Sequence, residues 1–316
     1  MFLTVTLNAA LDITYRVPRL RAHSTHRVQE VDERPGGKGV NVARVLAALG
    51  KDVTVTGFAG GATGAALRNL LAADQRERPN HARLTDAFVP ISGTTRRTVA
   101  VVDASSGDTT QLNEPGPAIS PAEWQAFTTA YAGLLPRTTA VALCGSLPPG
   151  VPVGAYAELV RAARAADVPV LLDTSGEALR RGIAARPDLV KPNGDELAQL
   201  TGVTVPLRAA RDARRRGAAA VVASLGAEGL LAATADGAWR AAPPQTIAGN
   251  PTGAGDSAVA GLLSGLADGL DWPARLSRAV ALSAATVAAP AAGEFDPSTY
   301  AAVLDRVEVA PQPHAA

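Results

Sequence analysis

Short apolar runs recur along the chain and alternate with longer segments in which apolar residues have helical spacing. Several runs are rich in Val and Leu without strict alternation, which is typical of strands buried on both faces. The runs predict strands at residues 2–7, 52–60, 97–103, 140–145, 168–173, 189–193 and 219–226. The segments between them predict helices at residues 39–49, 63–73, 121–133, 153–166, 208–216, 256–269 and 273–288.

This alternation predicts an α/β fold with an open, mostly parallel sheet that carries helices on both sides. In such sheets the ligand lies beyond the carboxyl ends of the strands. We therefore expect the functional motifs to follow the predicted strands directly.

Two segments depart from this pattern. Residues 12–34 alternate like an exposed strand pair, and residues 94–113 resemble a hairpin around "DASSGD". They predict a small second sheet, which serves as a lid over a pocket, as a dimer edge, or as ordinary decoration. Because no repeat or long linker is present, we expect one domain over residues 1–316 with this β lid inserted, and a frayed tail at 309–316.

Composition narrows the class of protein. The formal net charge is +1, which predicts no general attraction to nucleic acid or to an anionic membrane. Cys144 is the single cysteine, so an internal disulfide is excluded and a reducing compartment is favoured. The opening "MFLTVTLNAALD" predicts a strand rather than a signal peptide, and no apolar run predicts a membrane span. We expect a cytoplasmic protein.

The stretch "RPGGKGVNVARVLAALG" (34–50) places three glycines before a helix. Free backbone N–H groups at a helix start bind ligands, Lys38 adds a positive charge, and Asn41 offers hydrogen bonds in both directions. This combination suits a polyol, whereas a Gly-rich turn with a chance Lys is the structural alternative. The spacing of its glycines and lysine differs from the "GxxxxGK[ST]" pattern of the ATP-binding P-loop.

The stretch "GNPTGAGDSAVAGL" (249–262) combines a Gly-rich turn with an acid at a helix start. Amides of Gly253, Ala254 and Gly255 can form a cup that stabilises a transferring phosphoryl group. The helix dipole also favours an acid there, so an N-cap is the structural alternative for Asp256.

Other motifs follow strands. In "VKPNGDEL" (190–197) Asn193 and Glu196 lie on one side of a helix start, where Glu196 can hold Mg²⁺ through water; helix capping is the alternative. Small-residue turns in "CGSLPPGVP", "LLDTSG" and "SLGAEGLL" bring further candidates to the strand ends. These candidates are Ser146, Asp173, Ser224, Gly226 and Gly229.

Taken together, the motifs resemble the ribokinase-like carbohydrate kinases, the family that includes the B-type phosphofructokinases. "PGGKGVNVA" is similar to the first signature of that family and "PTGAGDSAVAGLL" to the second, with the other motifs in the expected order between them. The resemblance implies a three-layer fold with a Rossmann-like, mostly parallel sheet between helices. It also implies an ATP- and Mg²⁺-dependent kinase whose β lid forms a dimer contact. It implies that Asp256 is the catalytic base and that Gly253, Ala254 and Gly255 form the anion hole.

The same resemblance assigns the nucleotide side of the site. ATP-binding residues are Lys191, Asn193, Ser224, Gly226 and Gly229. Glu196 holds the metal through water, and Asp173 is a second metal candidate.

"VTLNAALD" is similar to the start of the branch that phosphorylates ketohexose phosphates. The implied sugar ligands are Asp12, Gly37, Lys38 and Asn41. Arg96 in "GTTRRT", Ser146, and Arg27 from a partner subunit are the implied ligands of the existing phosphate, with Arg97 an alternative to Arg96.

Fructose 1-phosphate, converted to fructose 1,6-bisphosphate, is the favoured substrate on this reading. Tagatose 6-phosphate and fructose 6-phosphate are alternatives, and so is an unphosphorylated sugar or nucleoside. A catalytically silent sugar-phosphate sensor is the alternative of another class. A dinucleotide oxidoreductase is disfavoured because "LNAALD" lacks the glycine fingerprint.

Overall fold

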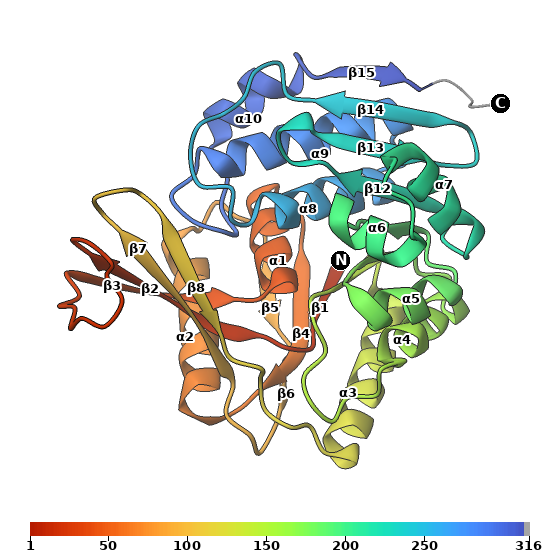
Figure 1. Ribbon diagram of the computed structural model, residues 1–316. Helices are drawn as coiled ribbons and strands as arrows, with labels where there is room; N and C mark the ends of the chain where they lie inside the picture. The colour runs from red at the N-terminus through yellow and green to blue at the C-terminus, as the bar shows by residue number, and fades with distance from the viewer. Residues whose placement is uncertain (313–316) are drawn as a thin grey trace.

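The computed structural model describes residues 1–312 and contains an 11-stranded sheet at its centre (Figure 1). Its parallel strands are β1 (Phe2–Thr6), β4 (Val53–Ala59), β5 (Leu84–Asp86), β6 (Val89–Pro90), β9 (Ala140–Cys144), β10 (Val170–Asp173), β11 (Leu189–Val190) and β12 (Ala220–Ser224). Antiparallel strands β13 (Leu230–Ala233), β14 (Ala238–Ala242) and β15 (Glu308–Pro311) extend one edge. The order is β15-β14-β13-β12-β11-β10-β9-β1-β4-β5, with β6 beside β4.

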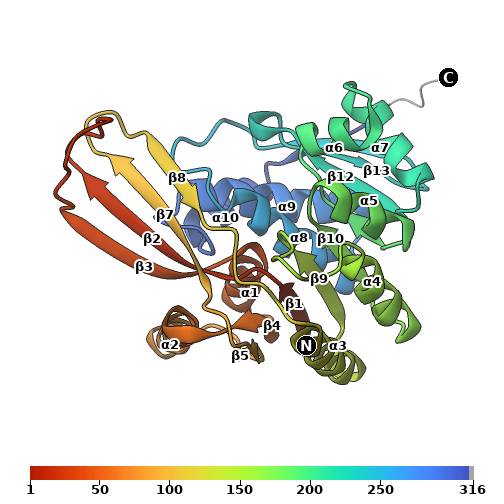
Figure 2. The ribbon, with the colours of Figure 1, turned by 60° about the horizontal axis from the view of Figure 1, so that its bottom comes forward.

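Helices cover both faces of this sheet, so the predicted three-layer α/β fold is confirmed (Figure 2). One core lies under α1 (Lys38–Ala48), α2 (Gly61–Glu77), α8 (Ala254–Ala267) and α9 (Trp272–Val287). The other lies under α3 (Pro121–Leu134), α4 (Ala155–Ala165), α5 (Gly176–Ala184), α6 (Gly194–Thr201) and α7 (Pro206–Arg215). Helix α10 (Pro297–Leu304) packs against α9.

Strand β1 shows why the central strands lack an alternating pattern. Phe2 joins the core under α1 and α8, whereas Leu3 and Val5 join the core on the opposite face. Both faces exclude water, so every position favours an apolar or small side chain, and each fully buried Leu or Val contributes roughly 1.5–3 kcal/mol.

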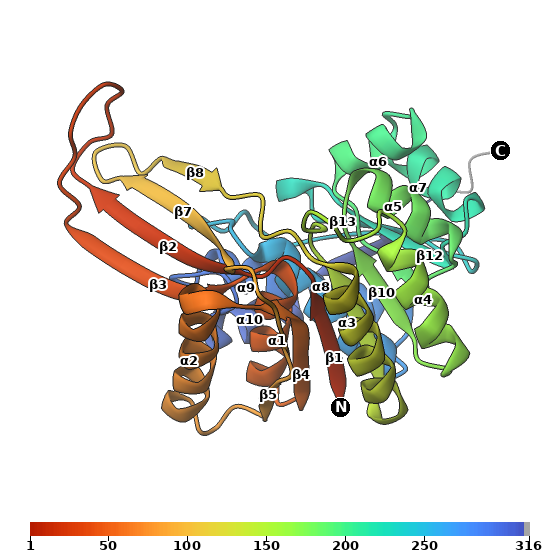
Figure 3. The same ribbon diagram turned by 90° about the horizontal axis from the view of Figure 1, so that it is seen from below.

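The two segments that departed from the α/β pattern form a second sheet in the order β3-β2-β7-β8. It consists of β2 (Ala10–Val17), β3 (Glu30–Gly36), β7 (Arg96–Asp103) and β8 (Thr109–Asn113). Figure 3 shows this sheet projecting from the body of the molecule beside α1 and α2. The small predicted sheet is therefore present.

Local pattern was insufficient at several places. Helix α5 and the antiparallel pair β13–β14 were not predicted, because their segments are only four to nine residues long. The expectation of a frayed tail was wrong for residues 309–311, which pair with β14 as part of β15; residues 313–316 lie outside the described chain. Within residues 1–312, no helix has the length and apolar character needed to span a bilayer.

Candidate active site

The glycines of "PGGKG" let β2 and β1 approach the start of α1. A Cβ on Gly36 would lie 2.1 Å from the Asp12 carboxyl carbon, and one on Gly39 would lie 2.3 Å from the Thr6 hydroxyl. Gly37 has φ +109°, a conformation that L side chains rarely adopt. Gly36 thus makes room for Asp12, a role for this glycine that sequence reasoning missed.

Asp256 lies in the first turn of α8 and is 8% exposed. Asn41, in the first turn of α1, donates a hydrogen bond from Nδ2 to Asp256 Oδ2 at 2.8 Å. The two Gly-rich motifs therefore meet in space although 215 residues separate these side chains. The structure brings together the predicted base and one predicted sugar ligand.

Two lysines lie beside this pair, held by one buried carboxylate. Lys38 Nζ is 3.2 Å from Asp173 Oδ2, and Lys191 Nζ is 3.5 Å from Asp173 Oδ1. A Cβ on Gly255 would be 3.7 Å from Lys191 Nζ, so this ammonium group lies at the start of α8. Asp173 and Lys191 are buried and paired, as buried charges require, whereas the Lys38 side chain is 42% exposed.

The charges shift the titration of the site. Burial and the neighbouring Asp173 raise the pKa of Asp256 to about 6, although Asn41 and the two lysines lower it. Burial opposes protonation of Lys38, yet Asp173, Asp256 and Glu196 together raise its pKa. Asp256 is therefore a stronger base than an ordinary carboxylate, with two lysines nearby. A general base works best when its pKa lies near the working pH.

The predicted anion hole is only partly available in this structure. Gly253 has φ +86° and begins α8, and Ala254 N donates a hydrogen bond to Pro251 O at 3.1 Å. In residues 1–312, the N–H groups of Gly253 and Gly255 make no such backbone bond. The turn thus engages the Ala254 amide, and the anion hole formed by Gly253, Ala254 and Gly255 stays a prediction.

A cavity of about 590 Å³ lies on one side of this helix start. Asn193, Ser224, Gly226 and Gly229 line it, together with Gly255. Asn193 and Ser224 are joined by an isolated parallel bridge, and Gly229 has φ +82° where a Cβ would meet Ala241 O at 2.1 Å. Four of the five predicted ATP-binding residues thus share one cavity, and the fifth, Lys191, lies beside Gly255 at its wall.

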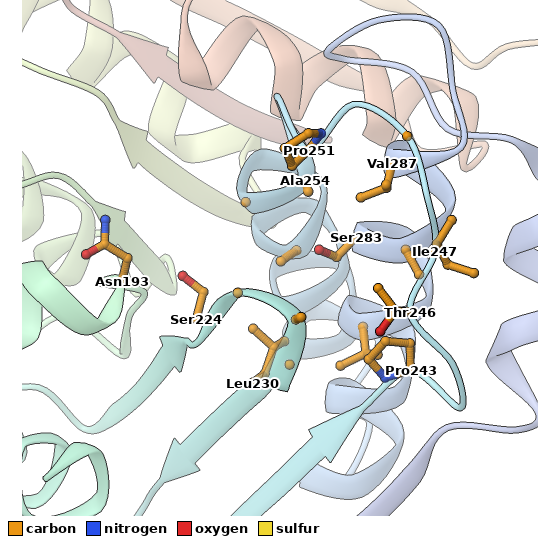
Figure 4. A pocket seen from close by; sticks show the side chains of 18 of the residues that line it. Asn193, Ser224, Leu230, Pro243, Thr246, Ile247, Pro251, Ala254, Ser283 and Val287 are labelled. Atoms are coloured by element: carbon orange, nitrogen blue, oxygen red, sulfur yellow. The ribbon is translucent and has the colours of Figure 1, made fainter. Parts of the chain in front are cut away.

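The opposite wall of this cavity escaped the sequence analysis. Figure 4 shows Asn193 and Ser224 on one side and Thr246, Ile247 and Val287 on the other. These residues come from α9 and the segment before α8. They carried no detectable signal, because apolar residues that line a pocket resemble those that fill a core.

A second cavity, of about 400 Å³, lies between the start of α8 and the four-stranded sheet. Asp12, Asn41 and Thr98 line it, as do Asn250 and Thr252. Burial raises the pKa of Asp12 to about 6, and Arg96 lowers it. Of the predicted sugar ligands, Asp12 and Asn41 reach this cavity directly, whereas Lys38 lies at Asp173 and Gly37 forms the turn into α1.

The sheet separates the two candidate arginines. Arg96 Nε donates to Asn8 O at 3.2 Å and Arg96 Nη1 to Glu114 O at 3.1 Å. Arg97 instead forms an exposed ion pair with the Glu114 carboxylate at 2.8 Å. Since successive side chains in a strand point to opposite faces, Arg96 shares the face of Asp12 and Thr98, and Arg97 does not.

Ser146 and Arg27 occupy different environments. Ser146 follows β9 and accepts a hydrogen bond from Asn8 Nδ2 at 3.1 Å. Arg27 is exposed in the loop between β2 and β3 and lines neither of the two cavities. Within one chain, the structure therefore does not bring Arg27 to the site.

The donor set fits Mg²⁺ held mainly through water and phosphate. Glu196 Oε2 accepts from Asn193 N at 2.9 Å and closes a capping box on α6, which leaves Oε1 for a metal-bound water. Asp173 Oδ1 accepts no hydrogen bond, but this carboxylate is 1% exposed and lies against two lysines. No cluster of three metal-ligating side chains occurs in residues 1–312. Mg²⁺ does not need such a cluster, because it often binds through one or two carboxylates, waters and substrate phosphates.

The fold has three layers, and a cavity of nucleotide size lies beside a buried carboxylate at a helix start. This combination is that of a ribokinase-like kinase. The chain belongs to the pfkB family of carbohydrate kinases, because the model of that family matches residues 5–299.

Relatives with curated names point the same way. The chain is 42% identical over 289 residues to a 1-phosphofructokinase of Rhodobacter capsulatus, with 89% of each chain covered. It is 36% identical over 312 residues to a 1-phosphofructokinase of Haemophilus influenzae, with 97% of each covered. Phosphofructokinase-2 of Escherichia coli, solved with fructose-6-phosphate, is 30% identical with a TM-score of 0.85, covering 96% of this chain and 98% of that one.

Proposed function

We propose that the protein transfers the terminal phosphoryl group of ATP to the C6 hydroxyl of fructose 1-phosphate, which yields fructose 1,6-bisphosphate. The observation that carries this proposal is the position of Asp256 between the two cavities. Pro251 and Gly255 line the larger cavity, and Asn250 and Thr252 line the smaller one. A phosphoryl group that passes from one cavity to the other therefore crosses the N-terminus of α8. The names of both curated relatives support the choice of substrate.

In this reaction Asp256 accepts the proton of the attacking hydroxyl. The new bond joins the C6 oxygen to phosphorus, the bond to the leaving ADP oxygen breaks, and ADP carries away the displaced negative charge. The amides of Gly253 and Gly255, the dipole of α8 and the Lys191 ammonium group stabilise charge on the transferring group. Such transfer depends mainly on positioning and electrostatics, both of which this chain supplies before the substrate binds.

Mg²⁺, when bound with ATP, neutralises phosphate charge. Glu196 would hold the metal through water, and Asn193, Ser224, Gly226 and Gly229 line the cavity that would take the nucleotide. We assign Asp173 chiefly to holding Lys38 and Lys191 in place, because both of its oxygens face ammonium groups.

The sugar phosphate lies under the four-stranded sheet. Asp12, Gly37, Lys38 and Asn41 contact its hydroxyls. Arg96 and Ser146 bind the phosphate that it already carries, with Arg27 of a second subunit as a further ligand.

One panel assay tests the substrate. ADP release is measured with ATP and fructose 1-phosphate, fructose 6-phosphate, tagatose 6-phosphate or ribose. We expect kcat/KM to be highest for fructose 1-phosphate. A higher kcat/KM for another ketohexose phosphate would identify that sugar as the substrate. A preference for ribose would contradict the proposed phosphate site. Absence of turnover with every sugar would favour a sugar-phosphate sensor.

We also propose a homodimer built through the four-stranded sheet. Val31 is 59% exposed and Leu112 is 60% exposed, and strand register puts both on one face with Ile13 and Val99. Replacing Val31 and Leu112 together by Asp should convert a dimer to a monomer in size-exclusion chromatography with light scattering. Val205→Asp, at a position 50% exposed elsewhere, is the matched control. A single buried thiol and an ATP-dependent reaction suit the cytoplasm.

A further inference from the structure

Asn8 is a buried amide within "VTLNAALD" to which the sequence analysis assigned no role. It lies in the turn between β1 and β2 and is 7% exposed. Its Nδ2 donates to Pro115 O at 3.0 Å and to Ser146 Oγ at 3.1 Å. Its backbone oxygen accepts from Arg96 Nε at 3.2 Å. One residue therefore contacts two of the three proposed ligands of the substrate phosphate, Ser146 and Arg96.

The orientation of this amide is determined by its neighbours. Pro115 O is a carbonyl and can only accept, so the Asn8 group that faces it must be the NH₂ group. Asn8 Oδ1 is then left buried without a hydrogen-bond partner. Gly116, with φ +99°, allows this position, because a Cβ there would lie 2.2 Å from Oδ1. An unpaired buried acceptor costs about 1–3 kcal/mol, so the orientation is kept against an energetic penalty.

This orientation determines what Ser146 can do. Asn8 Nδ2 donates to the Ser146 oxygen, so the hydroxyl hydrogen of Ser146 must point elsewhere. Ser146 is exposed at the end of β9, where its hydrogen can be donated to an anion. Arg96 is oriented at the same time, since Asn8 O and Glu114 O each accept from one of its nitrogens.

We propose that Asn8 is a positioning residue for the substrate phosphate, because its amide turns the Ser146 hydroxyl into a donor while its carbonyl orients Arg96. The inference rests on the proposed function and adds to it the residue that makes the phosphate site select a phosphorylated sugar. Asn8 does not touch the reacting atoms, so its effect acts on sugar-phosphate affinity rather than on the chemical step.

Asn8→Ala and Asn8→Asp test this proposal on the full-length protein, with Asn69→Ala on exposed α2 as control. Asn8→Ala should raise KM for fructose 1-phosphate and the inhibition constant of inorganic phosphate about tenfold, with kcat and KM for ATP within about twofold of wild type. Asn8→Asp has nearly the same volume but accepts the Ser146 hydrogen and adds a negative charge. It should therefore raise both constants for phosphate-bearing ligands further.

A double-mutant cycle separates positioning from a general structural role. In the Ser146→Ala background, Asn8→Ala should have a clearly smaller effect on KM for fructose 1-phosphate than in wild type. Equal increases in both KM values, or an undiminished effect in that background, would overturn the proposal. If Asn8→Ala does not fold, Asn8→Asp and Asn8→Ser carry the same test, since each fills more of the site.

The two proposals fail differently. If wild type turns over no sugar phosphate, the proposed function fails. If wild type turns over a sugar phosphate and neither Asn8 variant changes its KM, only the role of Asn8 fails.

Discussion

Asn41 Nδ2 donates a hydrogen bond to Asp256 Oδ2 at 2.8 Å and so joins the start of α1 to the start of α8. This contact fixes the orientation of the carboxylate before any substrate binds. Oxygen Oδ2 is engaged by Asn41, so Oδ1 is the oxygen that this hydrogen bond leaves for a substrate hydroxyl. The consequences of this geometry can be measured directly.

The first prediction concerns the chemical step. Asp256→Asn should lower kcat by about 10²–10⁴-fold with little change in either KM, because the variant cannot accept the hydroxyl proton. Steady-state kinetics with ATP and fructose 1-phosphate measure this. Asp268→Asn, at the other end of α8 where Asp268 pairs with Lys51 and Arg278, should retain activity. A near-normal kcat in Asp256→Asn would show that Asp256 is not the catalytic base.

The same substitution should stabilise the fold at neutral pH. The folded pKa of Asp256 is about 6 against an ordinary value of 3.8, so between these values the folded state binds more protons than the unfolded state. Stability therefore falls as pH rises from about 4 to 6, and the cost is fully present at pH 7. Urea unfolding of Asp256→Asn at pH 7 should show a gain of about 1–3 kcal/mol, which should vanish near pH 4. An equal gain at both pH values would contradict this account.

Activity should have an acidic limb near pH 6. Asp256 must be ionised to accept a proton, so kcat/KM should fall as pH drops below about 6. Asn41→Leu removes a hydrogen bond that lowers this pKa, so the limb should move to higher pH. Asp12 has a similarly raised pKa, and Asp12→Asn serves as a control that should keep the Asp256 limb. The pH dependence of all three proteins decides the matter, and an unmoved limb in Asn41→Leu would count against the assignment.

Neighbouring arginines offer a matched pair for the phosphate site. Arg96→Ala should raise KM for fructose 1-phosphate by about 10- to 100-fold and leave KM for ATP nearly unchanged, since a charge-assisted contact is lost. Arg97→Ala removes only an exposed ion pair with Glu114, so it should change both values little. Comparable effects of the two substitutions would show that strand register does not select the ligand.

Glu294 should be important for stability rather than chemistry. Its Oε1 lies 2.8 Å from an Arg34 nitrogen, 3.0 Å from an Arg44 nitrogen and 2.8 Å from an Arg78 nitrogen. Arg44 is only 4% exposed, so Glu294→Gln leaves a buried guanidinium short of negative charge and should cost about 3 kcal/mol. Denaturant unfolding measures this, with exposed Glu158→Gln as the control. Unchanged stability would mean that Asp74 and the Ala292 carbonyl suffice for Arg44.

Much of the fold followed from local pattern. The buried strands of the central sheet and the long amphipathic helices were predicted within a few residues, because burial on two faces or on one face imposes a repeating pattern on the chain itself. The small second sheet followed in the same way from two segments that broke the pattern. Helix α5 was missed although Leu179 and Ile183 lie four residues apart on its buried face, because nine residues are too few for a periodic pattern to stand out.

The candidate site also has residues that the sequence revealed and residues that it did not. Asp256, Asn41 and the glycines around them were found because their motifs are continuous in sequence. Asn8, Gly36 and the apolar wall at Ile247 and Val287 were missed, because each acquires its role only from a neighbour distant in sequence. The hydrogen bond from the Ala254 amide to the Pro251 carbonyl likewise depends on the path of the turn.

By itself the sequence determined the alternation of strands and helices, the two Gly-rich helix starts, and the acid in the second of them, because these are local properties of composition and spacing. Only the tertiary structure decided that Asn41 reaches Asp256, that Arg96 rather than Arg97 shares a face with Asp12, and that Asp173 joins two lysines. These relationships depend on strand register and helix packing, which are set by the summed burial of side chains throughout the chain. No single segment contains that information.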